Sequence, residues 1–108
     1  MICYLTHNFD GDKSNIERAK KITKGLQKQD LANCYICPLV MFPFTEYQDV
    51  GYDGVMELRI DLLTCADRLI VAGEQISKEV RMEIDFAKLV KMEVMRLEEN
   101  GDLRPFTE

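Results

Sequence analysis

The chain has 108 residues, which suits one compact domain, and 46% of them are apolar, enough to form a core. It carries 14 basic and 19 acidic residues, a formal net charge of −5. We therefore expect neither a nucleic acid nor an anionic membrane as a partner, because surfaces rich in phosphate repel so acidic a chain.

No stretch of the sequence is typical of a membrane-spanning segment. The longest uncharged stretch, residues 31–45, is interrupted by Pro38 and Pro43 and is shorter than the roughly 20 apolar residues that a bilayer requires. The first residues, 1–5, lack a basic flank and are too short an apolar run for a signal peptide. We expect a cytoplasmic protein.

The four cysteines raise the question of a metal site. Cys34 and Cys37 have Cys-x-x-Cys spacing, but they fall in an apolar run that is typical of a buried strand. Positions an odd number apart on a strand point to opposite faces, and His7 is the only histidine. We interpret these thiols as buried and structural, and expect no metal and no other cofactor.

The first third of the chain predicts a strand, a loop and a helix. Residues 2–6 form a short apolar run, and Gly11 follows within a polar loop. Ser14 and Glu17 have capping-box spacing, so we expect a helix over residues 15–29 with Ser14 as its N-cap. The polar side of this helix is basic, and we interpret it as a solvated face in preference to a phosphate or partner site. Its basic residues are Arg18, Lys20, Lys21, Lys24 and Lys28.

The rest of the chain continues to alternate between strands and helices. An irregular aromatic segment, residues 40–53, follows the second strand. Ser77 is a candidate N-cap for the last expected helix. Residues 98–108 are expected to be a polar tail. The expected strands span residues 33–39, 68–72 and 93–97, and the expected helices span residues 54–65 and 78–90.

This alternation predicts one α/β domain over residues 1–97, in which helices cover both faces of a parallel sheet and the first strand is central. Ligands of such sheets bind outside the carboxyl ends of the strands. Those ends correspond to residues 7–11, 40–52 and 73–77.

Glu83 departs from the pattern of its helix. At about 100° per residue it falls within the apolar arc, between Val90 and Ala87. A charged carboxylate there costs several kcal/mol unless it is paired or lines a cavity. A carboxylate at a cleft is typical of a nucleophile or a general base. The alternative is a side chain that bends out to solvent or forms a structural pair with a buried arginine. Arg59 is a candidate for that partner because it falls among the apolar positions of the preceding helix.

Two stretches carry a resemblance to a known family. Residues 4–9 read Tyr-Leu-Thr-His-Asn-Phe, and an Asp-led strand that begins at Asp67 is followed by Ser77 and, six residues later, Glu83. Over residues 2–97 the chain resembles the nucleoside 2-deoxyribosyltransferase-like superfamily, and within it the small bacterial and phage members.

The resemblance implies a three-layer flavodoxin-like sheet of about four strands in the order 2-1-3-4, assembled as a homodimer or a higher homo-oligomer. It also implies that Glu83 is the nucleophile that attacks the anomeric carbon, and that Ser77 contacts the sugar or its phosphate. A carboxylate beneath the ring stabilises the oxocarbenium-like state through which an N-glycosidic bond breaks.

We expect further substrate contacts from two loops. His7, Asn8 and Phe9 follow the first strand, and Phe44 and Tyr47 offer aromatic surface on which a base can stack.

Two functions remain open at this point. One is an enzyme that cleaves the N-glycosidic bond of a nucleoside or nucleotide, as a deoxyribosyltransferase or a hydrolase, with Glu83 as nucleophile. The other is a non-catalytic module of the same fold that binds a nucleotide-type ligand. Glu79 and Arg81 favour the second function, because active relatives have glycines at these positions. Arg59 favours it as well, because active relatives have an acid there.

Overall fold

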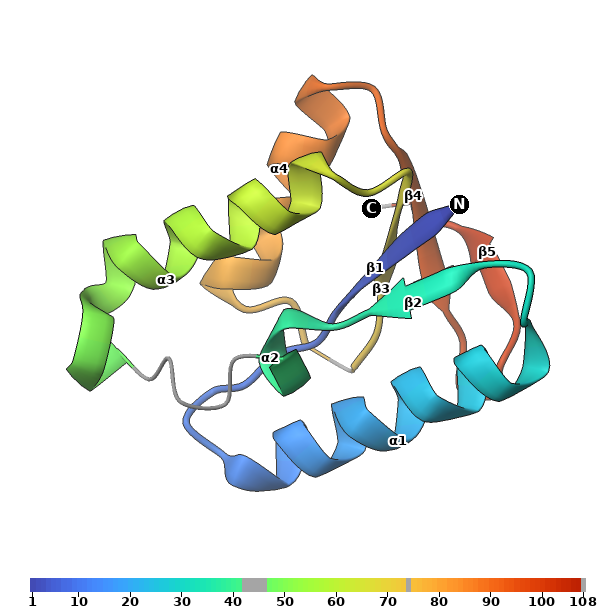
Figure 1. Cartoon of the computed structure of the whole chain (residues 1–108), viewed down its shortest axis with the longest axis horizontal. Coiled ribbons are helices and arrows are strands. Elements are labelled where there is room, and N and C mark those ends of the chain that lie inside the picture. Colours follow the sequence, from blue (N-terminus) through green and yellow to red (C-terminus); the bar gives the residue numbers. More distant parts are fainter. Residues whose placement is uncertain (42–46, 74, 108) are drawn as a thin grey trace.

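The computed structural model describes residues 1–41, 47–73 and 75–107, and of residues 47–50 and 52 the backbone alone (Figure 1). Strands and helices alternate along most of this length. In chain order the elements are β1 (Ile2–Thr6), α1 (Lys13–Gln29), β2 (Cys34–Ile36), α2 (Pro38–Met41), α3 (Tyr47–Thr64), β3 (Arg68–Val71), α4 (Lys78–Leu89), β4 (Glu93–Leu97) and β5 (Leu103–Pro105).

The strands form a single mixed sheet in the order β2-β1-β3-β4-β5. β1 pairs in parallel with β2 and β3, and β3 pairs in parallel with β4. The predicted α/β class and the order of the first four strands are confirmed, and β1 lies inside the sheet between β2 and β3, but β3 is the middle strand. The expected count of four strands is wrong, because β5 adds a fifth strand that is antiparallel to β4.

β5 lies in the segment for which we expected a polar tail. A tight turn makes this strand possible: the Asn100 side chain accepts from the Asp102 amide at 3.0 Å, and Gly101 takes a φ of 92°. Leu103 then pairs with Leu97, and the Phe106 amide donates to the Val94 carbonyl at 3.0 Å. Asn-Gly is a strong hairpin signal, and the polar composition of the segment concealed it.

Helices cover both faces of the sheet because the side chains of β1 alternate between them (Figure 1). Cys3 and Leu5 belong to a core cluster that includes Ala19 of α1. Tyr4 belongs to a second cluster, which includes Leu63 of α3 and Ile84 of α4. α1 and α2 therefore pack on one face, and α3 and α4 on the other.

The N-cap of α1 differs from the prediction. Asp12, not Ser14, caps this helix, and its carboxylate accepts hydrogen bonds from the Ser14 amide at 2.9 Å and the Ser14 hydroxyl at 2.7 Å. These bonds lower the pKa of Asp12. Aspartate caps a helix as well as serine does, and the capping-box spacing on which the prediction of Ser14 relied takes no account of Asp12. In α4 the predicted N-cap is confirmed, since the Ser77 hydroxyl accepts from the Val80 amide at 3.3 Å.

The segment after β2 is more helical than we expected. β2 ends at Ile36, and Pro38 begins α2, a first-turn position at which proline's missing N–H is not needed. The predicted strand over residues 33–39 is therefore too long. α3 begins at Tyr47 and contains a non-helical residue at Gly51, with φ 75° and ψ 162°. The predicted helix over residues 54–65 is the part of α3 beyond this break.

The cysteines divide by burial. Cys3 and Cys37 are buried, which raises the pKa of both thiols, whereas Cys34 and Cys65 are exposed. The expectation that both thiols of the Cys-x-x-Cys motif are buried is wrong for Cys34, because this residue begins β2 at the edge of the sheet. Within the described ranges, no group of three or more His, Cys, Asp or Glu residues is placed to hold a metal ion.

None of the helices in the described part of the chain has the length and apolar character needed to cross a membrane.

Candidate functional site

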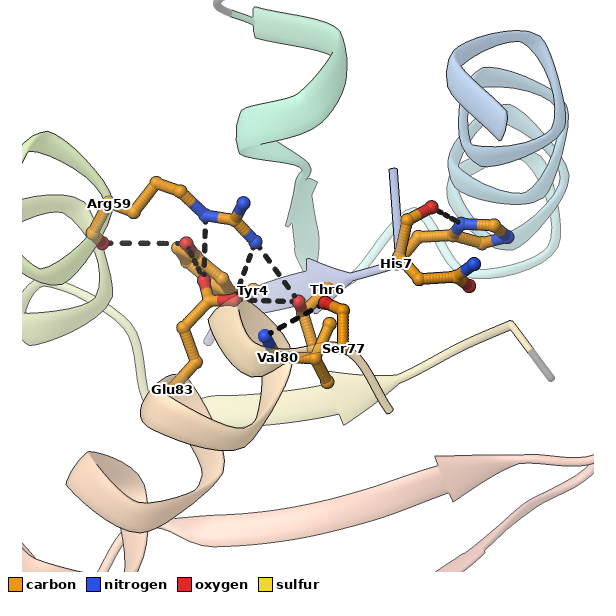
Figure 2. Close-up of polar contacts among 8 residues, drawn as sticks. Tyr4, Thr6, His7, Arg59, Ser77, Val80 and Glu83 are labelled. Carbon is orange, nitrogen blue, oxygen red and sulfur yellow. Dashed lines mark hydrogen bonds and ion pairs between the residues drawn. The ribbon is translucent and has the colours of Figure 1, made fainter. Parts of the chain in front are cut away.

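Glu83 lies on the second turn of α4 and points at the sheet between α3 and β1 (Figure 2). Its side chain is fully buried, with 0% exposed. Val80, Ile84 and Ala87 on the same helix are buried with it, as the helical periodicity predicted. The sequence therefore places a carboxylate inside an apolar interface, where it needs hydrogen-bond donors to remain charged.

Three side chains supply those donors. The guanidinium of Arg59 on α3 donates to both carboxylate oxygens, from Nη2 to Oε1 at 2.5 Å and from Nε to Oε2 at 3.3 Å. The Thr6 hydroxyl donates to Oε1 at 2.8 Å, and the Tyr4 hydroxyl donates to Oε2. Both carboxylate oxygens of Glu83 thus accept hydrogen bonds from the chain itself.

The Arg59–Glu83 pair is buried on both sides, since the side chain of Arg59 is 9% exposed. Burial is the largest single influence and would lower the pKa of Arg59, but the negative charge of Glu83 and the contributions of Tyr4 and of the hydrogen bonds together outweigh it and raise that pKa above its usual value. Burial, followed by the charge of Glu83, raises the pKa of Tyr4 well above its usual value. Arg59 therefore stays charged and Tyr4 stays protonated, so both remain donors to the carboxylate.

His7 lies on the other side of the sheet from Glu83. Thr6 points to α4, so the next residue along the chain points to α1, and Figure 2 shows His7 directed away from Glu83 toward that helix. We expected Glu83, Ser77 and the loop after β1 to line one pocket. The alternation of β1 instead separates His7 from the carboxylate.

The tautomer of His7 follows from its contacts. Its Nδ1 lies 2.7 Å from the carbonyl oxygen of Asn8, and a carbonyl can only accept, so Nδ1 carries the proton. Burial lowers the pKa of His7, which keeps the ring neutral at pH 7 and leaves Nε2 as an acceptor. Among the described residues neither His7 Nε2 nor Asn8 Oδ1 has a hydrogen-bond partner, although both atoms are buried.

Gly73, two residues beyond the end of β3, packs against these two acceptors. A Cβ at this position would lie 2.4 Å from Asn8 Oδ1 and 3.2 Å from His7 Nε2, and the φ of Gly73 is 85°. Only glycine fits both the backbone conformation and the space. Two buried acceptors thus converge on the backbone of Gly73 at the carboxyl ends of β1 and β3.

The remaining predicted contacts are dispersed. Ser77 caps α4, and the Phe9 carbonyl accepts from the Asp12 amide at 3.0 Å and from Asn15 Nδ2 at 2.8 Å, so Phe9 helps to begin α1. Phe44 lies outside the described residues. Tyr47 begins α3, and its side chain is outside the described part as well.

Sequence reasoning named Arg59 as a possible partner of Glu83 but missed Tyr4, Thr6 and Gly73. Tyr4 and Thr6 sit in an apolar run that is typical of any buried strand. Their alternation with Cys3 and Leu5 was the signal that assigned them to one face. Gly73 directly follows an apolar strand, and a glycine there is a signal for close backbone approach.

In a comparison with protein-family models, residues 1–97 match the family described as "Domain of unknown function (DUF7768)". The chain belongs to the DUF7768 family. No curated protein matches the sequence. The region matched by the DUF7768 model ends with β4, so the Arg59–Glu83 pair and the His7–Asn8–Gly73 cluster lie within it, and β5 lies beyond it.

Proposed function

We propose that the DUF7768 chain is a binding domain for a small nucleotide-type ligand, and that Glu83 stabilises its fold without attacking that ligand. The observation that carries this proposal is the enclosure of Glu83, whose side chain is fully buried and whose oxygens both accept hydrogen bonds. A nucleophile has to approach the reacting carbon to about 3–3.5 Å. Arg59, Tyr4 and Thr6 occupy the space around the carboxylate in which that carbon would lie.

The proposed place of the ligand is the edge of the sheet where β1 and β3 end. The chain connects β1 to β2 on one side and returns to β3 on the other, and such a reversal of strand order is where ligands of open α/β sheets bind. His7 Nε2 and Asn8 Oδ1 find no partner there in the part of the chain that the structure describes, and a buried acceptor without a donor costs about 1–3 kcal/mol. An N–H or O–H group of the ligand would offset that cost.

The nucleotide character of the ligand rests on the resemblance to the nucleoside 2-deoxyribosyltransferase-like superfamily. From the same resemblance we propose that the fold is the three-layer flavodoxin-like one. The mixed five-stranded sheet with helices on both faces supports this proposal.

Titration calorimetry with a panel of nucleosides and their 5′-monophosphates tests the binding proposal. We expect saturable binding of at least one member and, in parallel NMR spectra, a shift of the ring resonances of His7, the only histidine. Asn8→Ala should weaken that binding, whereas Asn33→Ala, at the opposite end of the sheet, should not. The proposal fails if no member of the panel binds, or if the bound ligand leaves the resonances of His7 unchanged.

A second candidate function is cleavage of an N-glycosidic bond with Glu83 as the nucleophile. The specific observation in its favour is that Thr6, the last residue of β1, and Tyr4 both donate hydroxyl hydrogen bonds to the carboxylate and so orient it. Attack requires that Arg59 and Tyr4 first release the carboxylate. Glu83-dependent release of free base from a deoxynucleoside or deoxynucleotide would establish this function.

We also propose that the protein is cytoplasmic and that it assembles as a homodimer or a higher homo-oligomer. Leu89 is 79% exposed and Val90 is 49% exposed at the end of α4, and this apolar surface is reduced when another copy covers it. Light scattering at micromolar concentration tests the assembly, and the mass of a monomer would contradict it.

A further inference from the structure

His7 and Asn8 each have one polar side-chain atom that the chain holds and one that it leaves without a partner. Nδ1 of His7 donates to the Asn8 carbonyl at 2.7 Å, and Nδ2 of Asn8 donates to Oδ2 of Asp10 at 2.6 Å. These two bonds orient the imidazole and the amide. The remaining atoms, His7 Nε2 and Asn8 Oδ1, can therefore only accept, and neither accepts a hydrogen bond from the described residues.

The two acceptors face one point beside Gly73. The place where a Cβ would stand on this residue is 2.4 Å from Asn8 Oδ1 and 3.2 Å from His7 Nε2. One atom that carries two hydrogens can therefore donate to both acceptors. A hydroxyl group has a single hydrogen and would leave one of the acceptors without a donor, whereas an amino group has a hydrogen for each.

A cavity of about 930 Å³ adjoins this point. Its lining includes Gly73 and, from α1, Arg18 and Lys21. The ring of His7 is directed toward α1 (Figure 2), and the charge of Arg18 helps burial to lower the pKa of His7. A small molecule that occupies the cavity beside Gly73 thus lies next to both acceptors, and the volume is within the range of small-molecule sites.

We propose that His7 Nε2 and Asn8 Oδ1 accept hydrogen bonds from the exocyclic amino group of the ligand's base. The site would then select adenine and cytosine over their keto counterparts, hypoxanthine and uracil. A keto oxygen in the same place offers no hydrogen to either acceptor. A site built to hydrogen-bond a group rejects the analogue that lacks it, because the buried polar atoms then stay unpaired. The inference deepens the proposed function and rests on it for the nucleotide character of the ligand.

Titration calorimetry with matched pairs of nucleosides tests the inference. The pairs are 2′-deoxyadenosine with 2′-deoxyinosine and 2′-deoxycytidine with 2′-deoxyuridine, each also as the 5′-monophosphate. We expect the amino member of at least one pair to bind at least about tenfold more tightly than the keto member. Asn8→Ala should remove most of that preference. Asn33→Ala, which leaves both acceptors in place, should retain it.

An NMR measurement on the wild type gives a second readout that does not depend on the folding of a variant. The nitrogen resonance of His7 Nε2 should shift when the amino ligand binds, because this atom then accepts a hydrogen bond, and should shift less with the keto ligand. Shifts of equal size with both members of a pair would overturn the inference.

The remaining outcomes distinguish the inference from the proposed function. Equal binding of both members of every pair, or tighter binding of the keto member, overturns the amino contact and leaves the proposed function standing. A preference for the amino member that persists in a folded Asn8→Ala variant also overturns it, because other groups would then be responsible. Binding of no member of either pair overturns the inference, and it contradicts the proposed function as well if no other nucleoside or monophosphate binds.

Discussion

The charged groups of the Arg59–Glu83 pair lose their hydration when they are buried. Their mutual attraction has to offset that loss. Burial of two ions costs several kcal/mol each, and the loss is offset only where hydrogen bonds satisfy the remaining oxygens and N–H groups. Tyr4 and Thr6 provide this for the carboxylate, and Nη2 of Arg59 also donates to the Thr6 hydroxyl at 3.3 Å. The pair is therefore stable as a unit, and each member depends on the other.

Removing one member of the pair should be strongly destabilising. We expect Glu83→Ala and Arg59→Met each to lower the free energy of unfolding by about 3–5 kcal/mol, because each leaves a buried charge without its partner. Urea denaturation followed by circular dichroism measures the loss. The exposed pair Arg68–Glu93 is the matched control, and Glu93→Gln should cost less than about 1 kcal/mol. Equal losses in the two pairs would contradict a structural role for Glu83.

His7 should become protonated only at a pH below its usual range. Burial is the chief cause that lowers the pKa of His7 in the folded chain. In the unfolded chain His7 binds a proton as the pH falls through about 6.5, whereas in the folded chain it stays neutral until a lower pH. The unfolded state then holds more protons, and stability, complete above pH 6.5, falls as the pH drops through the folded pKa. NMR titration of the single histidine measures this pKa directly. A value at or above 6.5 would contradict the burial of the ring.

At the scale of the elements, the site depends on the residues directly after the strands. β1 ends in two side chains, His7 and Asn8, whose acceptors meet the loop after β3. That loop can approach closely only because residue 73 has no side chain. The same residue holds Arg96 of β4 through its carbonyl, so one glycine links the ends of three adjacent strands.

Gly73→Ala should therefore destabilise the protein. The added Cβ would lie 2.4 Å from Asn8 Oδ1, and the φ of 85° is strained for alanine. We expect a loss of about 1–3 kcal/mol in urea denaturation, together with weaker ligand binding. Gly25→Ala is the contrasting variant, since its Cβ meets nothing within 4 Å inside α1, and it should stabilise by about 0.5–1 kcal/mol. A stability of Gly73→Ala equal to that of the wild type would contradict the close contact.

At the scale of the whole molecule, buried weak acids make the fold sensitive to alkali. Burial, followed by a hydrogen bond to Asp30, raises the pKa of Tyr35 to about 12, and the pKa of Tyr4 is raised as well. Between pH 10 and 12 these groups stay protonated in the folded protein and lose protons in the unfolded chain. The contribution of the two tyrosines to stability is therefore complete below pH 10 and falls as the pH rises toward 12.

Tyr35→Phe tests this dependence. The variant should lose less stability than the wild type between pH 9 and pH 11.5 in urea denaturation, because one of the groups responsible has been removed. The remaining fall comes from Tyr4 and from the thiols of Cys3 and Cys37. An identical fall in both proteins would show that Tyr35 does not contribute.

Local patterns in the sequence were sufficient for the parallel part of the fold. Alternating apolar runs and amphipathic helices predicted β1, α1, β3, α4 and β4 closely, because each of these elements buries a periodic face. β5 escaped prediction because the polar composition of its segment concealed the Asn-Gly hairpin signal, and α2 escaped because it packs against α1 and β1, which are remote in the sequence. Periodicity showed that Glu83 is buried but not whether its partner is a ligand or Arg59, since that choice is made by the packing of α3 against α4.

The release of free base by the wild-type protein tests the central claim, that Glu83 is a structural carboxylate, most directly. The protein is incubated with each nucleoside and 5′-monophosphate that binds it, with and without a second free base as acceptor, and the products are separated by chromatography. We predict that bound ligands are recovered intact and that no base is released or exchanged. Release or exchange of base by the wild type that is lost in a folded Glu83→Gln variant would contradict this account and establish Glu83 as a nucleophile.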